Sequence, residues 1–263
     1  MNYPRHYYIR LLAIPILLVA VKACSQQYGE GYSFRLFDNI ANTKLIHAIE
    51  NEDTAEITRV LKSDTTFDIN TREKKFGQTL LSLAAGTDKP ASVLSLLKNG
   101  ANPNICDSFG QTALSSVCEV VSSREKAFEI IEALLKFGAN PNWQPCDSTI
   151  QNTRKNIPLE EAISNFRCSK LLIENGADYN FNDSSGYPVW FSMLALDGKI
   201  SESIFLAEYL LIEKKVRYPK IVWYSKPDKS PIYFDKLLLS YNTAGDPEKA
   251  KAKNNIIRYL ALE

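Results

Sequence analysis

Histidine, the side chain most often used as a general base, is almost missing from this sequence, with two residues in 263. One, His6, lies near the start of the chain, and the other, His47, lies in a segment with a helical pattern. Zinc motifs of the His-Glu-x-x-His type, Gly-x-Ser-x-Gly turns and phosphate-binding Gly-rich loops are absent as well. The sequence therefore predicts a protein that is not an enzyme and that holds neither a metal nor a cofactor.

A strong charge of one sign is also missing. The chain has 31 Lys and Arg against 30 Asp and Glu, which gives a formal net charge of +1. So small a charge offers no electrostatic footprint for nucleic acid, and we expect no nucleic-acid partner. The contents of 45% hydrophobic and 23% charged residues are ordinary for a folded domain.

The N-terminal apolar run is too short to cross a bilayer, which needs about 20 residues. The run, "LLAIPILLVAV", occupies residues 11–21 and follows two basic residues, Arg5 and Arg10. A basic start followed by a short apolar stretch is typical of a secretory signal peptide. We therefore expect export across a membrane rather than insertion into it.

The apolar run ends in "VKAC", and here the chain resembles bacterial lipoprotein precursors. Ala23 directly precedes Cys24, and the aliphatic Val21 lies three positions upstream of the cysteine. The resemblance implies a cleaved signal peptide over residues 1–23 and a lipid-anchored tether over residues 24–38.

The lipid would be attached to the sulfur of Cys24 and would hold the protein on a membrane rather than through it. We expect an anchor in the outer membrane of a bacterial envelope, with the protein facing the periplasm. Lys22 departs from the small or apolar residue of lipoprotein signals. An ordinary signal peptide, and a soluble periplasmic or secreted protein, is therefore the alternative.

One phrase is repeated along the chain. It reads "SLLKNGANPN" at residues 95–104, "ALLKFGANPN" at 133–142 and "LLIENGADYN" at 171–180, and a looser copy ends at Asn70. A second phrase precedes it, "FGQTLLSLAAG" and then "FGQTALSSVC". A period of 34 to 38 residues is typical of solenoid repeats, in which each unit buries its apolar face against its neighbours.

At these residues the chain resembles ankyrin-repeat proteins over roughly residues 40 to 215. The matching residues are Gly77, Thr79, Leu81, Ala84, Ala85, Gly110, Thr112, Leu114, Pro158, Leu159, Gly186 and Pro188. The resemblance implies an all-α ankyrin-repeat solenoid of about six helix–turn–helix units over residues 39–263. We place the units at 39–70, 71–104, 105–142, 143–180, 181–229 and 230–263.

Elementary helix chemistry agrees with these units. Thr79 and Thr112 stand where a hydroxyl can cap the first helix of a unit. Gly100, Gly138 and Gly176 stand just past the second helix, where a positive φ suits glycine. The second helix should bury a stripe formed by Leu96, Leu97, Leu134, Leu135, Leu172 and Ile173. The resemblance also leaves His47 exposed on the first unit.

The final unit is the least regular. We expect residues 216–229 to be a proline- and aromatic-rich connection. Ser230 and Pro231 should cap and start the next helix, and Asp246 and Pro247 should do the same for the last one.

Four cysteines follow Cys24. We expect Cys118 and Cys168 to be small core residues. Cys106 and Cys146 lie in neighbouring fingers, the hairpin turns that precede the first helix of an ankyrin unit. An oxidising periplasm could join them. Stacked repeats usually hold equivalent positions too far apart for disulfide geometry, so we expect these two sulfurs to stay apart.

Two segments are not repeated. The long finger at residues 143–156 is either a contact loop or an insertion that an exposed loop tolerates. The aromatic cluster of Tyr218, Trp223, Tyr224, Tyr233 and Phe234 is either an exposed recognition patch or a buried seal between the last units, and we favour the seal.

The resemblance implies binding of another protein without catalysis, by a monomer. We expect contacts from finger and first-helix positions: Lys74, Lys75, Gln78, Asp107, Phe109, Gln111, Trp143, Gln144, Asp183, Tyr187 and Trp190. A specific form of this function is an immunity-type inhibitor of a periplasmic toxin. The alternative is an accessory scaffold that supports an envelope enzyme or complex.

Overall fold

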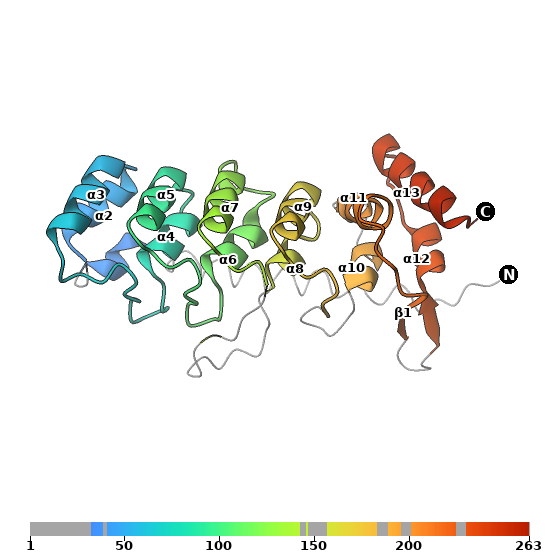
Figure 1. The fold of residues 1–263 in the computed structure, drawn as a ribbon, viewed down its shortest axis with the longest axis horizontal. Coiled ribbons are helices and arrows are strands. Elements are labelled where there is room, and N and C mark those ends of the chain that lie inside the picture. Colours follow the sequence, from blue (N-terminus) through green and yellow to red (C-terminus); the bar gives the residue numbers. More distant parts are fainter. Residues whose placement is uncertain are drawn as a thin grey trace.

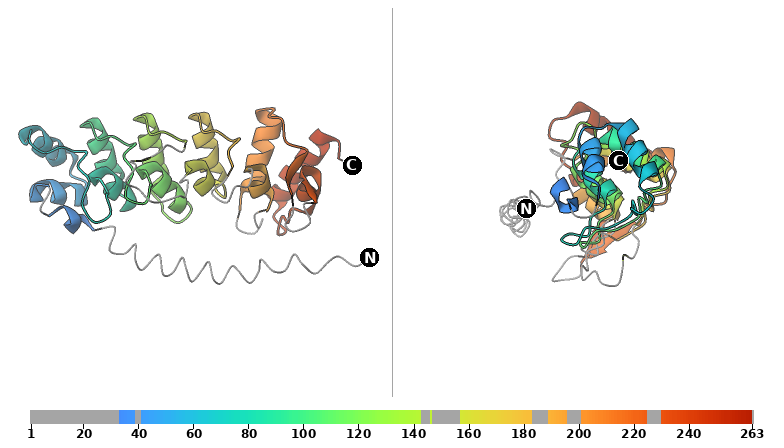
Figure 2. Two further views of the ribbon diagram at one scale, coloured as in Figure 1. Left: turned by 90° about the horizontal axis from the view of Figure 1, so that it is seen from below. Right: turned by 90° about the vertical axis from the view of Figure 1, so that its left-hand side faces the viewer.

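The protein is a row of helix pairs stacked along one axis (Figures 1 and 2). The computed structural model describes residues 33–38, 41–142, 146, 157–182, 189–195, 201–224 and 230–262. The paired helices are α2 (Thr43–Glu50) and α3 (Thr54–Ser63), α4 (Leu80–Gly86) and α5 (Pro90–Lys98), α6 (Ala113–Val120) and α7 (Ala127–Lys136), α8 (Pro158–Ala162) and α9 (Phe166–Glu174), α10 (Val189–Ala195) and α11 (Ser203–Glu208), and α12 (Phe234–Ser240) and α13 (Pro247–Leu260).

The helices form two rows. The first helices α4, α6 and α8 contact one another in turn, and so do the second helices α3, α5 and α7. A 3-10 turn, η2 (Phe34–Phe37), packs on α2 at the start, and a π-helical turn, η3 (Tyr209–Glu213), extends α11. The predicted all-α solenoid is confirmed.

Threonine caps start the regular units. Thr79 Oγ1 accepts the N–H of Ser82 at 3.1 Å, and Ser82 Oγ accepts the N–H of Thr79 at 2.9 Å. Thr112 and Ser115 form the same reciprocal pair. Because each pair satisfies two backbone donors that a helix start leaves open, the predicted caps are confirmed.

Glycines end the second helices. Gly100, Gly138 and Gly176 have φ values of 96°, 85° and 91°. The expected buried stripe of leucines and Ile173 lies in a core that is continuous along the solenoid. Both predictions are confirmed.

The last asparagine of each repeated phrase joins neighbouring units. Asn104 Oδ1 accepts the backbone N–H of Asn140 at 2.7 Å, and its Nδ2 donates to the carbonyl of Gly138 at 2.9 Å. Asn142 makes the equivalent bonds to Asp178 and Gly176. These bonds form an asparagine ladder, so the phrase that ends one helix pair also fixes the position of the next pair.

The C-terminal end corrects one expectation. Ser230 and Pro231 do not start a helix: Pro231 is the first residue of strand β2 (Pro231–Tyr233), which pairs antiparallel with β1 (Ile221–Tyr224). The β-branched and aromatic residues of β1 favour a strand, and proline is tolerated at the first position of its partner. Asp246 caps α13 as predicted and accepts the N–H groups of Glu248 and Lys249.

The predicted burial of the aromatic cluster is confirmed for some of its residues and not for others. Phe234 is fully buried, and the ring of the half-buried Tyr218 lies 4.5 Å from its ring, centroid to centroid. Tyr224 is 53% exposed, so for this residue the expected burial is wrong. It is the last residue of β1. The side chain of Trp223 lies outside the described part.

The cysteines give one confirmation and one correction. Cys118 and Cys168 are buried free thiols, as predicted. Cys106 and Cys146 are joined in a disulfide with their Cα atoms 5.9 Å apart, so the expected separation is wrong. Neighbouring fingers lie closer than a simple stack of helix pairs suggests, since their backbones hydrogen-bond directly through Ser108 N–H and the Phe76 carbonyl at 2.8 Å.

Candidate protein-binding surface

The fingers between α3 and α4 and between α5 and α6 project beyond the same edge of the helix rows (Figure 1). We define the finger-tip surface as Lys74, Lys75, Phe76, Ser108 and Phe109. These residues lie in the turns that precede the capping threonines, so the helix starts set their position.

Buried carboxylates hold the two finger turns. Glu73 accepts the backbone N–H groups of Lys75, Phe76 and Gln78 at 2.6, 2.7 and 3.0 Å. Asp107 Oδ1 does the same for Phe109 and Gln111 at 2.8 and 2.9 Å. Both acidic side chains are buried. Their carboxylate oxygens therefore accept hydrogen bonds within the turns and are not exposed to solvent.

Asp107 is electrostatically unusual. Burial raises the pKa of its carboxyl to about 6, although the N–H groups of Gln111 and Phe109 and the nearby Arg72 act in the opposite direction. The neighbouring Glu73 adds to the increase. We therefore expect the stability of the turn that Asp107 holds to depend on pH between about 4 and 6.

The outer side of the finger-tip surface combines aromatic rings with positive charge. Phe109 is 46% exposed, and its ring centroid lies 6.4 Å from that of Phe76. Lys75 Nζ lies 5.0 Å from the centroid of the Phe76 ring, and Lys74 is exposed beside it. Aromatic side chains on a rigid base contribute much of the binding free energy in protein interfaces.

The predicted contact residues separate into three groups. Lys74, Lys75 and Phe109 are exposed, whereas Gln78, Asp107 and Gln111 are buried. Trp143, Gln144, Asp183 and Tyr187 lie outside the described residues, as do Cys24 and the side chain of Trp190.

The two buried glutamines, Gln78 and Gln111, differ in their hydrogen bonds. Gln111 donates to Glu119 Oε2 at 3.2 Å and accepts from the Ser116 hydroxyl at 3.3 Å. The equivalent Gln78 has a buried Oε1 without a hydrogen-bond partner in the described part of the chain. Phe76 was not among the predicted contacts, although the phrase "FGQT" places it at the same register as Phe109.

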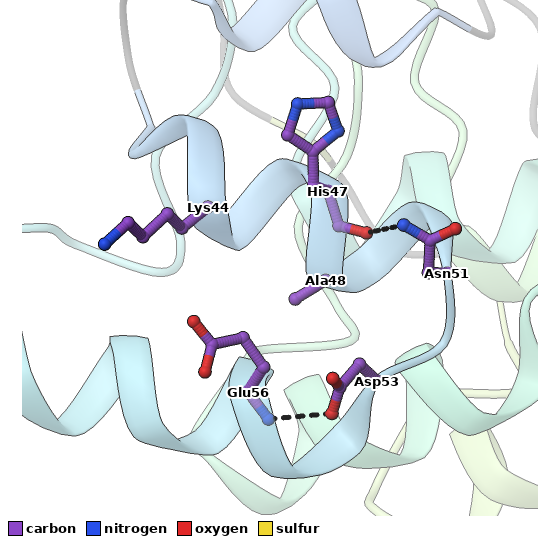
Figure 3. Close-up of a pocket in the computed structure, with 6 residues that line it drawn as sticks. All are labelled: Lys44, His47, Ala48, Asn51, Asp53 and Glu56. Atoms are coloured by element: carbon purple, nitrogen blue, oxygen red, sulfur yellow. Dashed lines mark hydrogen bonds between the residues drawn. The ribbon is translucent and has the colours of Figure 1, made fainter.

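A second surface feature is a shallow depression on the first helix pair (Figure 3). It is lined by Lys44, His47, Ala48, Asn51, Asp53 and Glu56. Asp53 caps α3 through the N–H of Glu56 at 3.0 Å, and Glu56 also pairs with Arg59. His47 is exposed, as predicted, and its Nδ1 lies 3.3 Å from Glu50 Oε2. These groups stabilise their own helices.

The described residues contain no group of three or more His, Cys, Asp or Glu side chains placed to hold a metal ion. None of the described helices combines the length and the apolar character that crossing a bilayer requires.

The stacked helix pairs, the capped first helices and the projecting fingers have the arrangement of an ankyrin-repeat solenoid. Residues 81–183 match a family model that describes ankyrin repeats (3 copies). The chain is also similar to a putative ankyrin repeat protein of Acanthamoeba polyphaga mimivirus, at 33% identity over 129 residues. That match covers 43% of this chain and 22% of the viral protein, so the chain spans about a fifth of the length of the curated relative it matches.

Proposed function

We propose that this protein is a non-catalytic binding module whose finger-tip surface holds an acidic segment of another protein. The observation that carries the proposal is the arrangement of charge at the finger tips. Lys74 and Lys75 are exposed, while Glu73 and Asp107 are buried under backbone N–H groups. The described finger tips therefore combine exposed lysine side chains with an aromatic pair.

Rigid fingers favour tight binding to one partner. Two features limit their motion: the hydrogen bond between Ser108 and Phe76, and the disulfide between Cys106 and Cys146. A surface that is already ordered loses little conformational entropy when a partner binds. Phe109 can then supply apolar contact area at the centre of the interface, with the lysines at its rim.

The test is affinity capture with matched charge variants. The full chain is immobilised and exposed to bacterial envelope extract, and the retained proteins are identified by mass spectrometry. We expect Lys74→Glu combined with Lys75→Glu, and separately Phe109→Ala, to weaken retention of the partner by about tenfold or more. The control, Lys98→Glu combined with Lys136→Glu, changes the same charge at the exposed ends of α5 and α7. Equal retention by the finger-tip variants and the control would place the contact elsewhere.

The same proposal includes an envelope location. Support comes from the N-terminal signal pattern ending at Cys24 and from the Cys106–Cys146 disulfide, since structural disulfides persist in oxidising compartments. We propose a lipid on Cys24 that holds the protein at the periplasmic face of the outer membrane. Labelling of cells with a fatty-acid analogue should mark the protein and should fail with Cys24→Ser. An unlabelled native chain in the periplasmic fraction would support the soluble alternative.

An immunity-type inhibitor of a periplasmic toxin is the finer form of this function. The pre-ordered finger tips support it, because inhibition requires one tight partner. Such an inhibitor would retain a single partner stoichiometrically, and substitution of Trp143 or Trp190 would release it. Retention of several weak partners would instead support an accessory scaffold for an envelope enzyme.

A further inference from the structure

Two buried thiols have no part in the proposed binding function. Cys118 lies in α6 and Cys168 lies in α9, 50 residues further along the chain. Both side chains are fully buried, and their sulfur atoms are 3.9 Å apart. The pair lies between the same two helix pairs that the Cys106–Cys146 disulfide joins at the fingers.

We propose that Cys118 and Cys168 are the site of a second disulfide, which cross-links these two helix pairs through their core. The inference is independent of the finger-tip surface, because it needs neither a partner nor an exposed residue. With both bonds closed, the two units would be joined once at the fingers and once between the helices. That arrangement would restrict the angle between them.

The distance between the sulfurs supports this step. Atoms 3.9 Å apart are in van der Waals contact, and a disulfide of about 2.0 Å requires them to approach by about 2 Å. Each sulfur moves by rotation about its own Cα–Cβ bond. The first disulfide already holds the two units together, so closing the second loop loses less chain entropy than it would in an open chain.

The chemistry is thiol–disulfide exchange with a disulfide oxidant, such as oxidised glutathione or a thiol oxidoreductase. The thiolate of one cysteine attacks the oxidant and releases one thiol. The second cysteine, as its thiolate, then attacks the mixed disulfide and releases the other thiol. Cys118 and Cys168 lose two protons and two electrons in total, and the oxidant is reduced to two thiols.

Burial decides when this reaction takes place. Loss of hydration raises the pKa of the Cys118 thiol, and the adjacent Cys168 raises it further. The reactive thiolate is therefore scarce in the folded protein, and an oxidant cannot reach it. The bond should form while the chain folds, or during transient opening between the two helix pairs. The competing view is that the two thiols only fill space in the core.

The test isolates the pair in the full chain. Cys24→Ser, Cys106→Ser and Cys146→Ser leave Cys118 and Cys168 as the only cysteines. The reduced, unfolded variant is refolded with excess oxidised glutathione, quenched and analysed by intact mass. We expect the loss of two hydrogen atoms and no thiol that can be alkylated in denaturant. Two alkylated thiols, or a stable adduct of glutathione on either sulfur, would overturn the proposal.

A second measurement covers the case in which that variant does not fold. The chain with only Cys24→Ser is refolded with the same oxidant and digested without reduction by trypsin and chymotrypsin. Chymotrypsin cuts after Phe109 and so separates Cys106 from Cys118. We expect one linked pair of peptides that contains Cys118 and Cys168, next to the pair from Cys106 and Cys146. Free Cys118 and Cys168 peptides would contradict the inference.

The route of formation gives a matched control. The folded protein is prepared with the first disulfide closed and with Cys118 and Cys168 reduced, and is then exposed to the same oxidant. We expect closure at least about tenfold slower than during refolding, because the buried thiols react only through opening. Subdenaturing urea should accelerate it. Equal rates for the folded and the refolding protein would show that burial does not control the reaction.

Discussion

Residues 43–142 and residues 201–262 both fold as helix pairs, yet they are joined to their neighbours by different means. In the first region the same residue types recur: a threonine cap, a glycine after the second helix and an asparagine that reaches the next unit. In the second region a β-hairpin, a π-helical turn and the packing of Phe234 on Tyr218 connect the elements.

The difference concerns how stability is distributed. In the first region equivalent asparagine bonds join each unit to the next. In the second region α13 packs on α11, and Asn255 Nδ2 donates to Glu208 Oε1 at 2.7 Å. Solenoid stability is approximately a sum of unit and interface contributions. We therefore expect the two regions to respond separately to substitution.

The largest expected effect is at the C-terminal seal. Phe234→Ala should destabilise this end by about 3–5 kcal/mol, because it removes a fully buried ring and leaves a cavity. Hydrogen exchange should show lost protection in α12 and α13, while the units over 43–142 keep theirs. The control is Tyr224→Ala in the same aromatic cluster, which should change stability by less than about 0.5 kcal/mol because this ring is half exposed.

The response to pH should single out the first region. The pKa of Asp107 is about 6 in the folded protein and about 3.9 in an unfolded chain, so the folded state keeps its proton over the interval between them. The free energy of unfolding should thus fall as pH rises from 4 to 6, by about 3 kcal/mol at most.

The substitution Asp107→Asn tests the source of this pH dependence. The amide has no charge, and its oxygen can still accept the N–H groups of Phe109 and Gln111. Denaturant unfolding of the variant at pH 4, 5 and 6 should show a flatter profile than the native chain. An unchanged slope would assign the pH dependence to other groups.

The asparagine ladder should contribute an intermediate amount. Asn104→Ala removes two hydrogen bonds between neighbouring units and should lower the free energy of unfolding by about 2 kcal/mol. Asn242→Ala is the matched control, since its Oδ1 accepts the N–H of Ala244 within one turn of the C-terminal end. Equal losses in denaturant unfolding would show that bonds between units add nothing beyond local turns.

The smallest expected effect concerns the residue with a positive φ that follows a helix in each region. Gly138 ends α7 with a φ of 85°, whereas Lys215 follows η3 with a φ of 53°. A side chain in this left-handed conformation is strained, and glycine is not. Lys215→Gly should therefore stabilise the C-terminal end by about 0.5–1 kcal/mol, and Gly138→Ala should destabilise its unit by about 1 kcal/mol. Thermal unfolding can resolve both signs, and a destabilising Lys215→Gly would contradict this reasoning.

Much of the fold could be predicted because the signals act within a few residues. A hydroxyl at Thr79 or Thr112 caps the helix that starts beside it, and the glycine at 138 ends the helix directly before it. Such choices depend on backbone geometry that the local sequence encodes. At the C-terminal end the local signal was misleading. Ser230 and Pro231 have the chemistry of a helix start, but Pro231 begins a strand that pairs with Ile221–Tyr224.

The candidate surface was predictable only in part. Register placed Lys74, Lys75 and Phe109 at the finger tips, where they are exposed. The same register chose Gln78, Asp107 and Gln111, which are buried. Asp107 accepts N–H groups of its own finger, and Gln111 bonds to Ser116 and Glu119. Exposure depends on what the adjacent unit covers, and a position in one repeat does not carry that information.

By itself the sequence determined the repeated helix pairs, their caps and their buried stripes, because each follows from residues close together in the chain. The tertiary structure decided which side chains meet across units. It brought Cys106 to Cys146 and Cys118 to Cys168, and it set Asn104 against the backbone of the next unit. These contacts depend on how closely neighbouring units stack, and only the packing of their side chains sets that distance.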